Sequence, residues 1–487
     1  MSARELITEH LDLWTGAVTK KSSSGRGSKG KVELTGVKKL RELIFELASR
    51  GALIPKVNDS ARTLKLQEFA ELVMGQAPPG SECNKNGIGE IFVKTGEFGA
   101  IYPEIKEWTT KPLRMARRGD VLICVVGATV GKLNMAINCA IGRSVAAIRP
   151  DQTVIPEYLY YCLIPFTLKI RSQSKGSAQG VIGKAVLNNV ELRVPPIDEQ
   201  KLIVQKVDEL MALCDRLEQQ TSDQLEAHET LVDTLLGALT QSENATELAD
   251  NWARLAAHFD TLFTTEQSID KLKQTILQLA TAGKLVPFQG APVPLKNILS
   301  FGPRNGFSPK ESNHETGCKV LKLGATTKGW LDLSESKNVD IGNSVLPHLW
   351  LKKGDILIQR GNAANHVGCN VLLDSDYPNY IYPDLMMKVR VKEEMAIPSF
   401  VALYLSAPGA RQFMWERMTG TSGTMPKISK KVVEEIPVSL PDIETQKAVV
   451  QKVDELTALC DQLKQRLNQA SETRCQLAEA VVEGALN

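Results

Sequence analysis

The chain repeats itself, and the order of its repeated segments constrains the fold more than any other feature of the sequence. Residues 195–217 align without a gap to residues 441–463, and sixteen of the twenty-three positions are identical. A second pair of similar segments, 37–55 and 269–287, aligns at an offset of 232, whereas the first pair aligns at an offset of 246. Repetition over this length indicates that one supersecondary unit is built twice.

The order of the repeats predicts a circular arrangement. The segment 37–55 is followed by a long stretch and then by 195–217, and the same order recurs from 269–287 to 441–463. If the two ends of the chain were joined, this order would describe two equivalent units. We therefore expect a circularly permuted molecule with pseudo-twofold symmetry, in which the last helix lies beside the helix at 37–55.

Both copies of the 195–217 repeat predict a long helix with a coiled-coil seam, because apolar residues alternate at spacings of four and three. In the first copy the predicted seam contains Ile203, Val207, Leu210, Cys214, Leu217, Thr221, Gln224, His228, Leu231 and Leu235. In the second copy it contains Val449, Val453, Leu456, Cys460, Leu463, Leu467, Ala470, Arg474, Leu477 and Val481. The polar members weaken a two-stranded seam, so we also expect packing against the 37–55 and 269–287 helices.

The intervening stretches lack helical periodicity and contain glycine, proline and short β-branched runs, which are typical of mixed α+β domains. Each stretch places a basic pair and Gly-Asp before a buried strand, at 117–120 and 352–355, and each ends in a polar, glycine-rich turn. We predict five regions: an N-terminal helical region with a basic Ser/Gly loop, 1–55; a globular domain, 56–194; a central helical region, 195–287; a second globular domain, 288–440; and a C-terminal helix, 441–487.

Charge separates these regions, although the whole chain carries only +2. Residues 56–195 and 288–440 carry +6 and +4, whereas 196–287 and 441–487 carry −9 and −3. Basic globular segments joined by acidic helices favour contact between the globular segments and a polyanion. The basic loop, with Lys20, Lys21, Arg26, Lys29 and Lys31, is either a phosphate contact or a solvated loop.

The motif search indicates a chain without catalytic or metal chemistry. No two of the nine cysteines lie closer than fifteen residues, which excludes the paired spacing of zinc ligands. GATVGK at 127–132 is one residue too short between its glycines for a phosphate-binding loop, and methyltransferase, kinase and hydrolase signatures are missing. The longest apolar run has seven residues, too few for a membrane helix, so we expect a cytoplasmic protein.

The arrangement as a whole resembles the specificity (S) subunit of type I restriction-modification systems. Two dissimilar domains are each followed by a closely similar helix, and PPIDEQ at 195–200 is the most specific local match. The resemblance covers essentially the whole chain. It implies an α+β fold in which two globular, α/β-mixed target recognition domains are joined by long antiparallel coiled-coil helices.

The same resemblance implies the function and the partners. Each recognition domain would read one half of a split sequence in double-stranded DNA, and the helices would bind two methylation subunits. Restriction (endonuclease/translocase) subunits are further implied partners. S-adenosylmethionine, ATP and Mg are implied for those partner subunits, with no cofactor and no catalysis in this chain. Eight seam residues are the candidates for coil packing and partner binding: Ile203, Val207, Leu210, Leu217, Val449, Val453, Leu456 and Leu463.

DNA contacts are expected from loop side chains at base edges and from basic groups at phosphates. The candidates in the first domain are Lys94, Thr95, Lys175, Ser177, Gln179 and Lys184. Those in the second domain are Lys322, Lys328, Arg360, Asn362, Thr421, Ser422, Lys427 and Lys430. Arg360 follows a buried strand in a Gly-Asn loop, from which a bidentate contact to guanine is possible.

Two other interpretations are compatible with parts of the sequence. A self-contained DNA restriction or modification enzyme would need the nuclease and methyltransferase motifs that the search did not find. A coiled-coil scaffold without a DNA role would explain the helices but not two basic, divergent globular domains.

Overall fold

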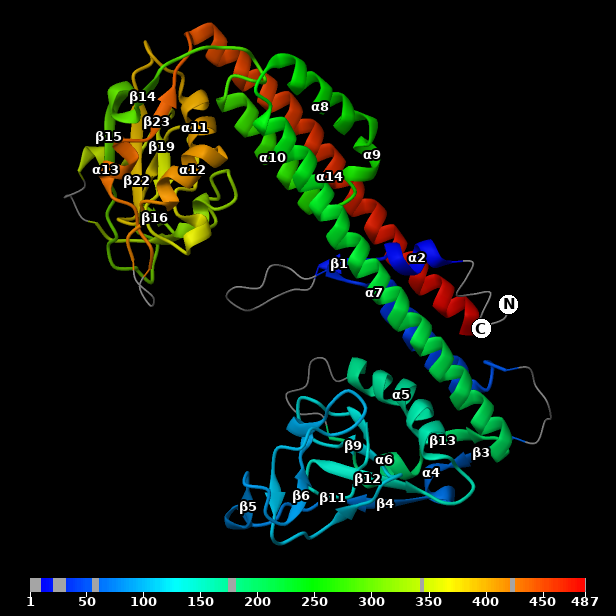
Figure 1. Ribbon diagram of the computed structural model, residues 1–487. Coiled ribbons are helices and arrows are strands. Elements are labelled where there is room, and N and C mark those ends of the chain that lie inside the picture. The colour runs from blue at the N-terminus through cyan, green and yellow to red at the C-terminus, as the bar shows by residue number, and fades with distance from the viewer. Residues whose placement is uncertain are drawn as a thin grey trace. The chain divides into compact units, whose positions relative to one another are not determined.

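Two long helices run through the structure. The computed structural model describes residues 10–20, 32–54, 61–173, 181–341, 346–420 and 425–486. Helix α7 (Ile197–Gln241) has 45 residues and α14 (Ile443–Leu486) has 44. The chain forms two compact units, of which unit 1 comprises Met1–Leu225 with Gln469–Asn487, and unit 2 comprises Glu226–Asn468. Each long helix therefore contributes residues to both units (Figure 1).

The helical part of unit 1 is built around one short amphipathic helix. It contains α2 (Leu11–Gly16), β1 (Thr19–Lys20), β2 (Val32–Glu33) and α3 (Thr35–Arg50). Helix α3 ends at Gly51, whose φ of +69° is the left-handed conformation that glycine adopts readily as a C-cap. Its buried face packs in one cluster with Ile203 and Val207 of α7 and with Ala478 of α14.

The globular segment of unit 1 contains two open sheets. The strands β10-β9-β12-β4 form one sheet, β5-β7-β6-β11-β8 form the other, and β13 pairs with β3. The elements are β3 (Arg62–Lys65), α4 (Leu66–Phe69), β4 (Ala70–Met74), η1 (Gly80–Glu82), β5 (Cys83–Asn84), β6 (Glu90–Val93), η2 (Thr95–Glu97), β7 (Trp108–Thr109), β8 (Met115–Ala116), β9 (Val121–Cys124), β10 (Leu133–Met135), β11 (Cys139–Ile141), β12 (Val145–Pro150), α5 (Pro156–Gln173), α6 (Lys184–Asn188) and β13 (Glu191–Val194).

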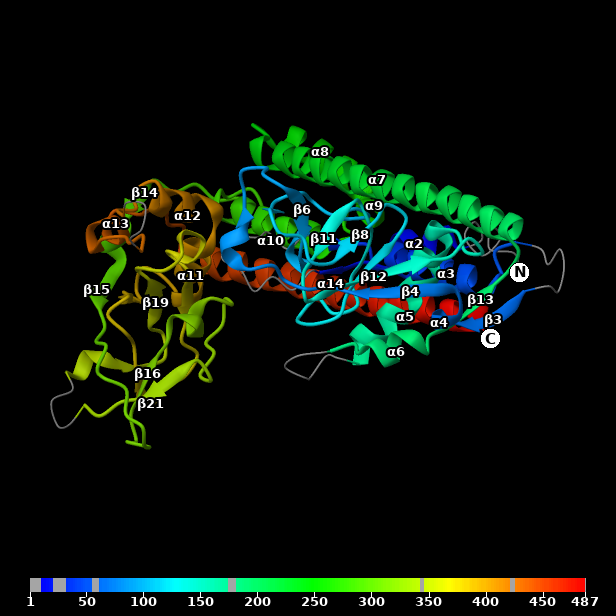
Figure 2. The same cartoon turned by 90° about the horizontal axis from the view of Figure 1, so that it is seen from below.

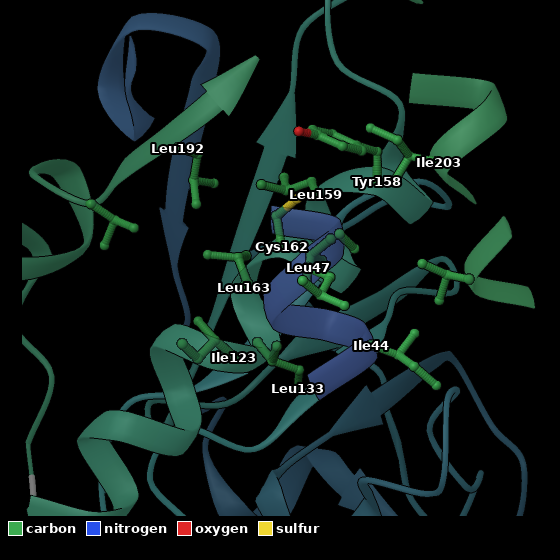
Figure 3. Packing of buried hydrophobic residues seen from close by; sticks show 14 of the residues in the cluster. Ile44, Leu47, Ile123, Leu133, Tyr158, Leu159, Cys162, Leu163, Leu192 and Ile203 are labelled. Atoms are coloured by element: carbon green, nitrogen blue, oxygen red, sulfur yellow. The ribbon is translucent and has the colours of Figure 1, made fainter. Parts of the chain in front are cut away.

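Strand β9 is a continuous apolar run because both of its faces are covered. Ile123 belongs to one cluster with residues of α3 and α5, and Figure 3 shows it near Leu163 of α5. The neighbouring Leu122 belongs to a second cluster, which it shares with Val93 of β6 and residues of β11. The sheet that contains β9 therefore lies between a helical layer and the second sheet.

Unit 2 repeats this plan. Its sheets are β15-β22-β19-β20 and β17-β16-β21-β18, and β14 pairs with β23. The elements are α8 (Ala245–Ala257), α9 (Phe259–Leu262), α10 (Glu266–Thr281), β14 (Pro292–Pro294), η3 (Leu295–Ile298), β15 (Leu299–Asn305), β16 (Lys319–Leu321), η4 (Leu323–Thr326), β17 (Ser336–Asn338), η5 (Pro347–Leu349), β18 (Trp350–Leu351), β19 (Ile356–Gln359), η6 (Ala364–His366), β20 (Asn370–Leu372), β21 (Tyr377–Ile381), β22 (Met386–Val391), α11 (Pro398–Ser406), α12 (Pro408–Trp415), α13 (Lys430–Glu434) and β23 (Pro437–Ser439).

The layers of unit 2 follow the same order. Ile356 and Ile358 of β19 pack with Phe400 of α11, whereas Leu357 packs with Val320 of β16 and residues of β21. Figure 2 shows α11 and α12 above β19 and β16 below it. The mixed α+β architecture predicted for both globular segments is therefore present, and its sheets are open.

Ion pairs between the short and long helices recur in the two units. In unit 1, Arg41 of α3 lies 2.6 Å from Asp215 of α7. In unit 2, Lys273 of α10 pairs with Asp461 of α14. Arg41 and Lys273 differ by the repeat offset of 232, and Asp215 and Asp461 differ by 246. The repeated sequences thus make repeated contacts.

The residues predicted for the seam are buried or partly buried in the first half of each long helix, but the predicted spacing is wrong farther along. Leu231 and Leu477, which the alternating three-and-four spacing placed in the seam, are 50% and 52% exposed. The following residues, Val232 and Ala478, are buried instead. A straight α-helix has 3.6 residues per turn, so a strict heptad pattern drifts by about 20° per repeat and eventually misplaces a residue.

None of the helices within the described ranges has both the length and the apolar composition that a membrane crossing requires.

Candidate nucleic-acid interface

The Gly-Asp pair before the buried strand of unit 1 forms a closed turn. Gly119 has a φ of +96°, and the backbone N–H of Asp120 donates to the carbonyl of Arg117 over 3.0 Å. The Asp120 carboxylate accepts a hydrogen bond of 2.9 Å from the backbone N–H of Arg117 and pairs with Arg149 of β12. This motif therefore holds β9 and β12 together and leaves no free carboxylate for chemistry.

The equivalent turn in unit 2 carries an additional buried charge. Asp355 accepts from the backbone N–H of Lys352 over 3.0 Å and pairs with Arg390 of β22. It also pairs, at 3.0 Å, with Lys388, whose side chain is only 2% exposed. Burial lowers the pKa of Lys388, and the adjacent Asp355 carboxylate opposes that shift. The Lys388 ammonium also donates to the Trp350 carbonyl over 2.8 Å.

The glutamine of the repeated helix motif joins each long helix to its globular segment. Gln200 accepts from the backbone N–H of Ile155 and donates to the carbonyls of Thr153 and Pro195, all over 2.8 Å. Gln446 accepts from Ile397 in the same way and donates to two carbonyls. Both side chains are buried, so PPIDEQ and its copy connect a globular segment to a long helix.

Four loops of unit 1 meet at one border of the two sheets. The loop after β9 is joined to the loop after β11, because the N–H of Val125 donates to the carbonyl of Ser144 over 2.8 Å. The segment before α6 joins the same loop, because the N–H of Ile182 donates to the carbonyl of Val125 over 2.8 Å. The turn after β6 lies next to Gly142. We call this border the loop edge of unit 1, comprising residues 94–95, 125–132, 142–144 and 181–184.

Unit 2 has a loop edge with the same backbone connections, comprising residues 322–328, 359–368, 382–385 and 425–430. The N–H of Arg360 donates to the Leu385 carbonyl over 2.8 Å, and that of Ile428 donates to the Arg360 carbonyl over 2.9 Å. Gln359 joins the turn after β16 to this loop through a 2.8 Å bond to the Thr326 hydroxyl. Within the described residues, the loops that sequence reasoning selected converge in both units.

The first-domain candidates have different surroundings. Lys94 forms an ion pair with Glu107, and the hydrogen bond with Glu107 raises the pKa of Lys94. Thr95 begins η2 and is half-buried, whereas Lys184 is exposed at the first residue of α6. Lys175, Ser177 and Gln179 lie outside the described residues, as do residues 21–31 of the basic Ser/Gly loop.

The second-domain candidates also divide by their contacts. Arg360 is half-buried, and the Asn362 amide is used inside the loop, where it donates to Gln359 over 2.6 Å. Lys328 lies 2.9 Å from Asp332. Four lysines at this loop edge are exposed: Lys322, Lys328, Lys427 and Lys430. Thr421 and Ser422 lie outside the described residues.

Sequence reasoning missed several exposed side chains of the unit 1 loop edge. Val126 is 37% exposed and Val181 is 65% exposed. The signal was present, because each valine lies within two residues of a glycine in a predicted turn, where an apolar side chain has no core to enter. The same loop edge borders a hollow of about 520 Å³, which is lined in part by Lys85, Lys94 and Arg143.

All eight apolar seam candidates lie on packed faces of the long helices. Ile203, Val207, Leu210 and Leu217 belong to the cluster of unit 1, and Val449, Val453, Leu456 and Leu463 belong to that of unit 2. Their contacts are therefore with this chain. The exposed apolar residues of the same helices are others, among them Leu213 and Leu459.

The interface contains no metal centre in the part of the chain that the structure describes, because no three His, Cys, Asp or Glu side chains gather there as metal ligands. Cysteine thiols in the described segments are free, without disulfide bonds.

Comparison with known proteins finds one family in both halves of the chain. The model described as "Type I restriction modification DNA specificity domain" matches residues 58–227 and 295–472. The specificity subunits of the type I restriction enzymes EcoEI and EcoAI, both from Escherichia coli, are each 30% identical to this chain, and the alignments cover 100% of each chain. The crystal structure of an HsdS subunit from Thermoanaerobacter tengcongensis shares 26% identity, with 43% of this chain and 62% of that chain covered and a TM-score of 0.31.

Proposed function

This chain belongs to the type I restriction-modification DNA specificity family, and from that premise we propose that it recognises a split DNA target and directs methylation and restriction subunits to it. The observation that carries the proposal is the pair of loop edges. Their backbone connections are the same, but their exposed side chains differ, as two recognition domains for two different half-sites require. The enzyme and scaffold interpretations are not favoured.

We place methyl transfer and cleavage in the partner subunits, which would hold S-adenosylmethionine, ATP and Mg²⁺. The carboxylates that could suggest a catalytic role in this chain have structural partners. Asp120 and Asp355 pair with arginines of the neighbouring strands, and Glu199 pairs with Arg193 over 2.7 Å. A non-catalytic chain is the simplest account of these contacts.

We further propose a pseudo-twofold arrangement with coiled-coil packing between the long helices. The repeated ion pairs of Arg41 with Asp215 and of Lys273 with Asp461 support it, because equivalent residues of the two repeats meet in each unit. Each unit also combines the first part of one long helix with the last part of the other. The five predicted regions are retained as the functional division of the chain.

Exposed leucines at repeated positions are the proposed docking residues for two methylation subunits. Leu213 and Leu459 occupy equivalent repeat positions, as do Leu231 and Leu477, and the four side chains are between 43% and 60% exposed. Unit 1 contains Leu213 with Leu477, and unit 2 contains Leu459 with Leu231. Each unit therefore offers the same pair of apolar residues on acidic helices, as binding of two copies of one partner requires.

Leu213→Asp should release one methylation subunit, and Leu213→Asp with Leu459→Asp should release both. A charge placed on a central interface residue typically costs at least about 2 kcal/mol of binding, roughly a thirtyfold weakening. Native mass spectrometry of the reconstituted complex measures the stoichiometry. Leu113→Asp, on an exposed leucine of the globular segment, is the matched control. Unchanged stoichiometry in the double variant would assign docking to another surface.

Exchange of residues 56–194 for the matching segment of a relative should change one half of the target and leave the other half intact. Each recognition segment is joined to its long helix by a separate glutamine, Gln200 or Gln446, so the segments are separable units. Sequencing of methylated DNA from cells that express the hybrid gives the new target. The reciprocal exchange of 288–440 should alter the opposite half. A hybrid that changes both halves at once would contradict two independent recognition domains.

A further inference from the structure

The two loop edges carry chemically different side chains at one matched backbone position. In unit 1, Val126 and Val181 face each other across an isolated antiparallel bridge. In unit 2, the equivalent bridge joins Gly361 to Lys427. The equivalence is structural, because the bridge follows the last residue of β9 or β19 by two positions in both units. The first domain thus has two β-branched apolar side chains where the second has a bare backbone and a lysine.

Several contacts fix the backbone on either side of the valine pair. The N–H of Ile182 donates to the Val125 carbonyl over 2.8 Å, and the Cys124 thiol lies 3.4 Å from the Val126 carbonyl. Directly opposed residues of an antiparallel bridge have Cβ atoms about 4.5–5.5 Å apart, and valine has essentially one free side-chain torsion. Four methyl groups are therefore held together at the surface, outside the apolar clusters of unit 1.

The surroundings of the pair are basic. Arg143 is exposed and precedes Ser144, whose carbonyl accepts the N–H of Val125. Lys184 is exposed three residues after Val181. Positive side chains next to a small apolar surface are complementary to a DNA groove, because phosphates flank the base edges there. In the major groove, thymine is the base that presents a methyl group, and valine-sized apolar side chains contact it.

We propose that Val126 and Val181 make the first recognition domain specific for thymine, through apolar contact with the thymine C5-methyl group in the major groove. The inference rests on the proposed function, since it names the base that one of the two domains recognises. The second domain uses Lys427 at the same position, and its half-site does not depend on a thymine methyl there. The two domains would therefore distinguish bases by different contacts at this position, an apolar contact in the first domain and a positively charged side chain in the second.

Replacement of thymine by uracil tests the proposal, because uracil keeps the base pair and lacks only the methyl group. The full chain with its methylation subunits is titrated with target duplexes in which one thymine at a time, on either strand, is replaced. At one or more positions of the half-site assigned to residues 56–194, the dissociation constant should rise roughly fourfold, the factor for returning one methyl group to water. In the half-site of the second domain, replacement of thymine by uracil should not raise the dissociation constant at the base that faces Lys427.

The variant Val126→Gly with Val181→Lys places the residues of the second domain at the bridge of the first. It should bind thymine and uracil duplexes equally while it retains its complex with the methylation subunits. Val181→Thr, a nearly isosteric surface change, should halve the uracil effect or more. The proposal would be overturned if the first half-site contained no thymine, or if the wild-type complex bound thymine and uracil duplexes equally. It would also be overturned if the double variant still bound uracil duplexes more weakly.

Two further outcomes separate this inference from the function on which it rests. Loss of methylation subunits by the double variant, with base discrimination intact, would make the valine pair a protein contact and overturn the proposal alone. Equal binding of the wild-type complex to its target and to duplexes with scrambled half-sites would overturn sequence recognition itself.

Discussion

Asp355→Ala is expected to destabilise unit 2 by about 3–5 kcal/mol, because it leaves a buried ammonium group without its counter-charge. The Lys388 side chain is 2% exposed and that of Asp355 is fully buried, and they lie 3.0 Å apart. The substitution also removes the carboxylate that pairs with Arg390 and accepts the backbone N–H of Lys352. Since the chain has two units, local unfolding is best followed by hydrogen exchange of the β19 and β22 amides, which should lose protection.

Two companion variants separate the charge effect from a general loss of packing. Asp120→Ala removes the equivalent carboxylate of unit 1 and should cost less than half as much. Its partner Arg149 is 22% exposed, and Ala147 occupies the position of Lys388. Asp355→Ala combined with Lys388→Met removes both charges and should recover most of the lost stability. A double variant as unstable as Asp355→Ala alone would contradict this account.

Insertion of four residues after Thr221 together with four after Leu467 is expected to abolish methylation at the original target and to create activity at a longer spacer. These positions are equivalent in the repeats, and α7 and α14 both contribute residues to each unit, so both connections must be lengthened. Four helical residues add roughly 6 Å. That length corresponds to about two base pairs at 3.4 Å each.

The spacer experiment uses oligonucleotides that differ only in the number of bases between unchanged half-sites. A matched insertion of one residue in each helix is the control, because it rotates the following residues by about 100° and should leave no spacer active. Methylation of the original target by the four-residue variant, with no tolerance of longer spacers, would show that the helices do not set the distance between half-sites.

The helices and the shared α+β plan were predictable because the sequence contains each of them as a repeat. Sixteen identities in twenty-three aligned residues leave little doubt that 195–217 and 441–463 form the same element. The end of the seam was not predictable from spacing alone. Leu231 and Val232 are both apolar, and only the accumulated rotation of a straight helix decides which of them faces inward.

The loops were predictable in position but not in side-chain orientation. Lys94 was selected as a basic loop residue, yet its ammonium pairs with Glu107, thirteen residues farther along the chain. Asn362 was selected as an amide for a base edge, yet its amide binds Gln359. The first contact depends on the tertiary approach of two separate segments and the second on the conformation of a single loop, and residue type alone predicts neither. The turn glycines indicated that each valine is exposed, but not that the two valines face each other, since they are 55 positions apart.

Unit 1 depends on residues that are synthesised after all of unit 2. Residues 469–486 of α14 supply Ala478 to the cluster around α3, whereas unit 2 comprises the uninterrupted stretch Glu226–Asn468. At about 5–20 residues per second, making that stretch takes roughly 10–50 s. During this interval the apolar face of α3 lacks its α14 cover, so a nascent chain exposes it to chaperones and proteases. The half of the protein that leaves the ribosome second is therefore the first to have all of its contacts.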